Sequence, residues 1–384
     1  MLSGEIQGSA APVPAIPSPY LMLVSFSSGD FVHFDASKIN ALNNSPYHGV
    51  AIPLVDAYDV ETHSVSDFKP ALSRMQNLKS DPWPWIFWNR LVGTTSEIAR
   101  KFPQSPSSKP YFTRIQGMDL YDQTGALTDF LRTYRQALQV AKNAGAPGIV
   151  IDMEVYNNYE LYDVDAVAKS LHQDPSKVKA RLHEIGKQLT NIAQTEYPDA
   201  TLWFLFTGLG ETPDPQRYRS VTHVVAGILE RAKEVHSQIK VVSGGELAGY
   251  CHRSPEALQD RLDRRARNFA PALSNYPNLH LGGTIAPWDG SAPRTGWMME
   301  DTCKDSNAKN LGDFSPMFQA LLSTYEYVWV YAADEAPYLP YSARAQNYNS
   351  ALTDALSKTA TARNQVGSLS LPRFLDISSL NRLP

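Results

Sequence analysis

The sequence predicts an α/β fold, a single (β/α)8 or TIM barrel with elaborated loops after its strands. Short β-rich runs alternate with helical stretches about eight times along the 384 residues. Each helix reaches the next strand within a few residues, whereas the connections that leave the strands are longer and richer in aromatic and polar residues. The length suits one barrel with long loops, so we expect one domain.

The expected strands are short apolar runs, and acids lie at or just after the ends of several of them. They are Tyr20–Phe26, Gly49–Val55, Trp85–Trp88, Gly148–Asp152, Thr201–Phe206, Lys240–Ser243, Leu279–Thr284 and Tyr327–Tyr331. The clearest helices between them are Thr128–Ala144, Pro175–Tyr197, Pro255–Ala270 and Ser342–Ala360. The third unit is the least regular, because Tyr111–Asp122 fits a loop, an extra strand or the next element of the barrel.

The N-terminal segment and the net charge limit the classes of partner and the cellular location that we expect for the protein. Residues 1–19 are expected to be a linker before a barrel of residues 20–384, with a signal or anchor already removed, which predicts a secreted or cell-envelope protein. No apolar run is long enough to span a membrane. The net charge is −4 and no dense Lys/Arg stripe occurs, which disfavours nucleic acid as a partner. Cys251 and Cys303 could pair or remain free thiols.

The strongest candidate for chemistry is the end of the run Gly148–Asp152. Side chains alternate along a strand, so Asp152 and Glu154 should point to the same side, toward the mouth of the barrel. Two neighbouring carboxylates can divide their work, because repulsion keeps a proton on one while the other stays ionised. The alternative is a salt-bridged or capping pair. We expect catalysis or direct contact with a substrate.

A further acid follows the run Lys240–Ser243. Gly244 and Gly245 let the chain turn sharply there, and Glu246 comes directly after them. This strand is two units after the one that carries Asp152, so Glu246 can face that pair across the mouth. Opposed carboxylates at about 5 Å, or wider, are the arrangement that cleaves a glycosidic bond. As an isolated loop residue, Glu246 would instead be solvated and idle.

Polar and aromatic residues follow other strands as well. Hydroxyl groups of a saccharide bind polar side chains, and the apolar faces of sugar rings stack on aromatic ones. Any single member could instead cap a helix or pack in the core. The expected contact residues are Asp56, Tyr58, Trp88, Asn89, Tyr156, Tyr250, Trp288, Asp289, Tyr331 and Glu335.

The sequence lacks the motifs of several other classes of enzyme. The sequence contains no Gly-x-x-x-x-Gly-Lys-[Ser/Thr] loop, no complete dinucleotide fingerprint and no Gly-x-Ser-x-Gly elbow. It also contains no His-Glu-x-x-His and no His-x-His on an early strand. We therefore expect neither a metal nor an organic cofactor.

Taken together, the motifs resemble those of (β/α)8-barrel glycoside hydrolases, in barrel order from Tyr20 to Lys358. The likeness is to a set of poorly characterised bacterial barrels with an Asp-x-Glu-x-Tyr strand end, a later Gly-x-Glu, and a last strand that begins Tyr-Val-Trp. Here these are Asp152–Tyr156, Gly244–Glu246 and Tyr327–Tyr331. Endo-acting fucanases look similar, and that resemblance implies an acid of the first motif paired with Glu246.

The predicted function is a glycosidase that acts on a polysaccharide or oligosaccharide through carboxylate acid/base catalysis, with retention as the expected course. Two alternatives stay open. One is a barrel that binds carbohydrate without cleaving it. The other is a chitinase-like, substrate-assisted hydrolase, since Gly148–Glu154 also looks like the chitinase catalytic strand. Pro147 and Val150 replace the earlier acids of that motif, which weighs against it.

Overall fold

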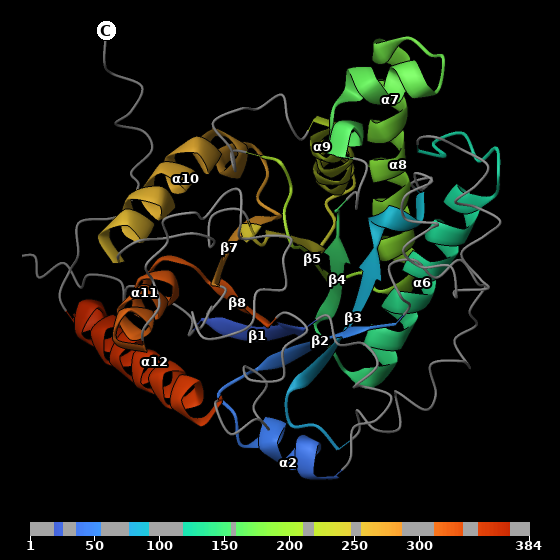
Figure 1. Ribbon diagram of the computed structural model, residues 1–384. Helices are drawn as coiled ribbons and strands as arrows, with labels where there is room; N and C mark the ends of the chain where they lie inside the picture. The colour runs from blue at the N-terminus through green and yellow to red at the C-terminus, as the bar shows by residue number, and fades with distance from the viewer. Residues whose placement is uncertain are drawn as a thin grey trace, which may run out of the picture.

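The computed structural model is a closed barrel of eight parallel strands that follow one another in chain order, which confirms the predicted fold class (Figure 1). The strands are β1 (Tyr20–Ser25), β2 (Gly49–Pro53), β3 (Asp81–Phe87), β4 (Gly148–Asp152), β5 (Thr201–Phe204), β6 (Lys240–Ser243), β7 (Leu279–Ile285) and β8 (Tyr327–Ala332). The structure describes residues 19–25, 36–54, 77–91, 118–154, 159–209, 219–246, 255–285, 311–332 and 345–368. All eight expected strands are present.

Helices surround the barrel (Figure 1). They are α2 (Ala36–Asn43), α6 (Ala126–Ala144), α7 (Val164–Ser170), α8 (Pro175–Glu196), α9 (Arg219–Glu234), α10 (Pro255–Asn275), α11 (Leu311–Thr324) and α12 (Ala345–Ser368), with short 3-10 turns η2 (Trp88–Leu91) and η3 (Tyr159–Tyr162). The four expected helices correspond to α6, α8, α10 and α12. The sequence interpretation did not identify α2, α7, α9 or α11.

Strand β3 begins four residues earlier than expected, at Asp81. Pro82 and Pro84 interrupt the apolar pattern there, and proline cannot donate a ladder hydrogen bond. The register explains why they are tolerated. β2 pairs with β3 from Asp81 onward, whereas β4 pairs with it only from Trp85 onward. The prolines therefore lie on a stretch where β4 makes no ladder with β3.

The barrel wall separates two kinds of core. The interior is strongly aromatic and contains Trp83, Trp85, Trp203 and Trp329 among its buried residues. The layer between the barrel and the helices is mainly aliphatic, and it includes Ile149 and Ile151, the neighbours of Val150 on β4. Alternation along each strand thus sends odd and even residues to different cores, as the pleat requires.

The irregular third unit includes a turn that starts α6. Of the segment Tyr111–Asp122, residues 118–122 are described, and Asp119 is the buried residue that organises them. Its carboxylate accepts hydrogen bonds from the backbone N–H groups of Gln123, Thr124 and Ala126. Gly125 then adopts a left-handed φ of 87° before the helix, so α6 begins at Ala126 rather than at Thr128.

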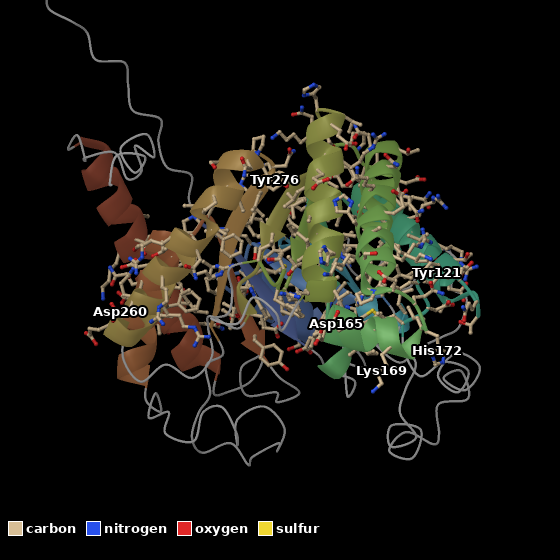
Figure 2. The ribbon with its side chains drawn as sticks, turned by 90° about the horizontal axis from the view of Figure 1, so that it is seen from above. Tyr121, Asp165, Lys169, His172, Asp260 and Tyr276 are labelled. Carbon is tan, nitrogen blue, oxygen red and sulfur yellow. The ribbon has the colours of Figure 1, made fainter. Side chains whose placement is uncertain are left out.

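Figure 2 orients the barrel through residues at its two ends. Tyr276 comes shortly before β7 and therefore marks the amino-terminal ends of the strands, here called the floor. Asp165 and Lys169 of α7, which follows β4, lie at the opposite end of the molecule. This opposite end, where the strands finish, is the mouth. Within the described ranges no helix is long and apolar enough to cross a membrane.

Candidate active site

The described residues include all three predicted catalytic acids and part of the predicted lining. Trp88 and Tyr331 are described, and Asn89 lies in η2, where only its backbone is described. The remaining predictions lie outside the described residues. These are Asp56, Tyr58, Tyr156, Tyr250, Trp288, Asp289 and Glu335, together with Cys251 and Cys303.

Strand β4 delivers Asp152 to the mouth of the barrel. Val150 packs in the interior cluster, so Asp152, two residues later, faces the same side. Only 1% of Asp152 is exposed, and its Oδ1 accepts a hydrogen bond of 2.8 Å from the backbone N–H of Glu154. This bond turns the chain as it leaves the strand. Glu154 is only partly buried, which makes it the more accessible carboxyl group of the two.

Strand β6 delivers Glu246 by a tight turn. The Gly244 N–H donates to the Phe204 carbonyl at 2.7 Å, and the Glu246 N–H donates to the Leu205 carbonyl at 3.0 Å, so the turn is fastened to the end of β5. A Cβ on Gly244 would meet Trp203 Nε1 at 3.0 Å, and Gly245 has a φ of +71°. Larger residues do not fit this turn, which explains the pair of glycines.

Successive residues of the turn face opposite sides of the barrel wall. Gly244 faces the interior ring of Trp203, whereas a Cβ on Gly245 would meet Arg265 of α10, on the outer side. Glu246 follows directly, beyond the end of β6, and is 3% exposed. Since β4, β5 and β6 are neighbours in the barrel, Asp152 and Glu246 stand at the same end, one strand apart.

The two described aromatic candidates differ in their positions. Tyr331 lies in the interior cluster near the end of β8, with its ring centroid 6.2 Å from that of Trp329. Its contact with a ligand stays a prediction. Trp88 is 1% exposed and packs edge-on against Phe130 of α6, at 5.2 Å between ring centroids. It belongs to the core outside the barrel, which differs from the expected place in a cleft. The physical reason is that Trp88 follows Phe87, an interior residue, and so takes the other side of the wall.

Three residues around the Glu246 turn were not anticipated from the sequence. Arg265 of α10 and the pair Ser243 and Thr207 are all buried. The Thr207 and Ser243 hydroxyl oxygens lie 2.9 Å apart, and an Arg265 Nη2 group donates to the Ser243 carbonyl at 2.9 Å. Arg265 lies in a helix with a repeating basic pattern, where a solvated arginine is the ordinary expectation. Only the fold reveals that it reaches the ends of the strands.

In the part of the chain that the structure describes, no group of three or more His, Cys, Asp or Glu side chains is placed to hold a metal ion. The described residues at the mouth include the carboxyl groups of Asp152, Glu154 and Glu246. A half-buried carboxyl group near a fully buried one can differ from it in proton affinity, which is what acid/base catalysis requires.

Comparisons with known proteins give the fold and no family. No protein-family model matches the chain, and no curated protein matches it. Among solved structures, the chain is similar to a glycoside hydrolase family 5 lichenase from Caldicellulosiruptor sp. F32, with 8% identity and a TM-score of 0.48, covering 93% of this chain and 99% of that chain.

Two other solved structures are also similar to this chain. The β-amylase catalytic domain of Paenibacillus polymyxa has 8% identity and a TM-score of 0.43, over 88% of this chain and 99% of that chain. Endonuclease IV of Thermus thermophilus has 11% identity and a TM-score of 0.40, over 88% of this chain and 100% of that chain.

Proposed function

We propose that this protein is a glycoside hydrolase that cleaves a polysaccharide or oligosaccharide by carboxylate catalysis. The observation that carries the proposal is the convergence of Asp152, Glu154 and Glu246 on one end of the barrel, from two strands separated by β5. The mouth is where enzymes of this architecture hold their catalytic groups. Two carboxyl groups on opposite sides of a glycosidic bond are sufficient for its hydrolysis.

The contacts distinguish the roles of Asp152, at the end of β4, and Glu154, two residues beyond it. The Asp152 carboxylate is buried and accepts the N–H group of Glu154, so it fixes the backbone that carries Glu154. Glu154 is the more exposed and is the group able to reach a substrate. We assign Glu154 as the partner of Glu246, with Asp152 as the positioning residue. Protein secretion or attachment to the cell envelope is part of the same proposal, because polymeric substrates lie outside the cell.

The test is a screen of purified protein against marine, plant and bacterial polysaccharides, fucans included, followed by variants. On any substrate that the wild type cleaves, Glu246→Gln and Glu154→Gln should each lower kcat by about 100-fold to 10,000-fold. Gln keeps the shape but cannot ionise or donate a proton as a carboxylic acid does. The matched control is Glu184→Gln, an exposed position on α8, which should keep the wild-type rate. A folded Glu246→Gln variant with substantial activity contradicts the assignment.

The two alternatives give different outcomes in the same screen. A binding barrel would retain an oligosaccharide in a binding assay and release no reducing ends. A chitinase-like hydrolase would cleave only N-acetylated sugars, because its nucleophile is the substrate's acetamido group. Activity on a polymer without acetamido groups would exclude the chitinase-like mechanism, and lack of turnover with measurable binding would favour the non-catalytic barrel.

A further inference from the structure

Arg265 is a buried cation that reaches from α10 to the ends of two strands. It is 3% exposed. Its guanidinium group donates to the carbonyl of Gly282 on β7, and at 2.9 and 3.1 Å to the carbonyl and hydroxyl oxygens of Ser243 on β6. The Phe269 and Tyr325 rings lie 5.0 and 5.3 Å from its Cζ. A long side chain held by several bonds and two rings has a single position.

That position is directly behind the turn that carries Glu246. A Cβ built on Gly245 would lie 2.7 Å from the Arg265 Cζ, so the guanidinium group is packed against the backbone of the residue that precedes Glu246. On the interior side, the Trp329 Nε1 group donates to the Gly244 carbonyl at 2.9 Å. β5 holds the same turn through the Leu205 carbonyl. Three elements other than β6 therefore fix the backbone turn that carries Glu246.

We infer that Arg265 is the positioning residue of Glu246, that it keeps the Glu246 carboxyl group ionised, and that Glu246 is therefore the nucleophile while Glu154 is the acid. This inference rests on the proposed function and assigns the two roles within it. Arginine retains its charge in proteins. In a buried region of low dielectric, a fixed cation beside the backbone of a carboxylate favours the charged form of that carboxylate.

Other charged groups around the site act in both directions. Arg261 and Arg264 lie on the same helix, and burial, followed by the charges of Arg264 and Arg265, lowers the Arg261 pKa. Across the barrel mouth are two acids, Asp152 at the end of β4 and Glu154 two residues beyond it, and like charges disfavour each other's ionisation. Arg265 is the cation that is buried against the turn, whereas Arg264 is exposed, so we attribute the effect to Arg265.

The roles define a balanced reaction. A Glu246 carboxylate oxygen forms a bond to the anomeric carbon while the bond from that carbon to the leaving oxygen breaks, and Glu154 gives its proton to the leaving oxygen. Water then returns a proton to Glu154 and supplies its oxygen to the anomeric carbon, which releases the Glu246 carboxylate. The two displacements together retain the configuration of the sugar.

The experiment measures the ionisation of Glu246 without requiring a substrate. Protein labelled with 13C at the glutamate carboxyl carbons is titrated by NMR, and the Glu246 resonance is assigned by its loss in Glu246→Gln. In Arg265→Met the Glu246 pKa should rise by about one unit or more, the scale expected for losing a close opposite charge. Arg264→Met is the matched control, since it removes an exposed cation from the adjacent position, and it should leave the Glu246 pKa unchanged. An unchanged pKa in folded Arg265→Met overturns the inference.

If Arg265→Met does not fold, a second variant tests the role of Arg265. Arg265→Lys keeps a charge but cannot reproduce the fork that spans both strand ends, so the Glu246 pKa should rise by a smaller amount. On any substrate cleaved by the wild type, its acid limb in kcat/KM should move to higher pH and kcat should fall more than KM changes. Wild-type titration and wild-type kinetics in Arg265→Lys overturn the role. If no polysaccharide is cleaved, the proposed function fails, while the titration still tests whether the charge of Arg265 acts on Glu246.

Discussion

The two ends of this barrel both carry acids on their strands, but they use them differently. At the floor, Asp81 accepts a hydrogen bond of 2.7 Å from the Tyr20 hydroxyl, and that hydroxyl accepts one of 2.7 Å from Trp83 Nε1. At the mouth, the Glu246 N–H donates to the Leu205 carbonyl, while Trp329 donates to the Gly244 carbonyl and Arg265 to the Ser243 carbonyl. At the floor, a carboxylate is bonded to a side-chain group of another strand, whereas at the mouth these bonds fix the backbone turn that carries Glu246.

This difference separates structural from functional acids more clearly than position in the sequence does. Asp81 and Asp152 both sit at an end of an apolar strand and both face the barrel interior. Conservative replacement of an acid in the floor network should cost stability, because it weakens bonds made in the folded state. Replacement of an acid at the mouth should cost activity with less effect on folding.

The largest expected effect comes from comparing Glu154→Gln with Asp81→Asn on a substrate that the wild type cleaves. Glu154→Gln should lower kcat by about 1,000-fold, the mid-range for losing a general acid. Asp81→Asn should keep kcat per folded molecule within about threefold and lower the free energy of unfolding by about 1 to 3 kcal/mol, since it removes a charged acceptor. Rate assays and urea unfolding measure both quantities. If Asp81→Asn loses the activity and Glu154→Gln keeps it, the assignment of floor and mouth is reversed.

The next effect tests whether Trp88 packs or binds. Because its ring is buried against Phe130, Trp88→Ala should lower the free energy of unfolding by about 3 to 5 kcal/mol, as expected for emptying a large aromatic site. Trp88→Phe should recover part of that loss, and KM for a saccharide should stay at the wild-type value in Trp88→Phe. Thermal unfolding and kinetics would check this. A stable Trp88→Ala variant with weakened saccharide binding would contradict the packing role and indicate that Trp88 contacts the saccharide.

A smaller effect concerns two glycines with nearly the same backbone conformation. Gly145, after α6, has a φ of 72°, and Gly245 has a φ of 71°, but a Cβ on Gly145 would meet nothing within 4 Å. Gly145→Ala should therefore cost about 1 kcal/mol of stability, from the left-handed backbone alone. Gly245→Ala should cost about 2 to 4 kcal/mol, because overlap with Arg265 and the Gly282 carbonyl adds to the strain. Equal losses in the two variants would mean that Arg265 yields easily, which weakens its role as a rigid support.

Much of the fold could be predicted because its signals are local. Strand β4 is an uninterrupted apolar run and α8 begins with Asp174 and Pro175, whose capping and fixed φ mark a helix start. The start of β3 was missed because Pro82 and Pro84 look like breaks until the register shows that β4 pairs only beyond them. Strand order and closure follow from the alternation of elements.

The site could be predicted only in part, because its supporting contacts join distant segments. Asp152 and Glu246 stand out as acids directly after buried strands. Arg265 does not stand out in the sequence. It lies on α10, and its side chain reaches carbonyl groups of β7 and β6. Neither the spacing nor the composition of the sequence reveals that contact. The prediction that Trp88 lies in the cleft was wrong because side chains alternate between the two sides of the barrel wall. A shift of one residue therefore moves a side chain to the other side.

The smallest expected effect tests the floor through pH. The Leu21 backbone N–H donates to His48 Nδ1 at 3.0 Å, which requires the unprotonated nitrogen. Burial lowers the His48 pKa from its ordinary value of 6.5, against the opposing charge of Asp81. A depressed folded-state pKa means that the contribution to stability is complete above the unfolded value of about 6.5 and is lost as pH falls through the folded value.

Between about pH 7 and about pH 5, the free energy of unfolding of the wild type should therefore fall slightly. The loss should be less than about 1 kcal/mol, because it concerns the single part-buried bond between Leu21 and His48. His48→Asn is the informative variant, since its amide oxygen can occupy the position of Nδ1 and accept the same N–H without titrating. Urea unfolding at both pH values should show a smaller acid-induced loss in His48→Asn than in the wild type. Kinetics on any cleaved substrate should show the same pH profile in both proteins, because His48 lies at the floor, away from the acids. A changed pH profile for cleavage in His48→Asn would show that the two ends of the barrel are coupled, and the separation of a structural floor from a functional mouth would fail.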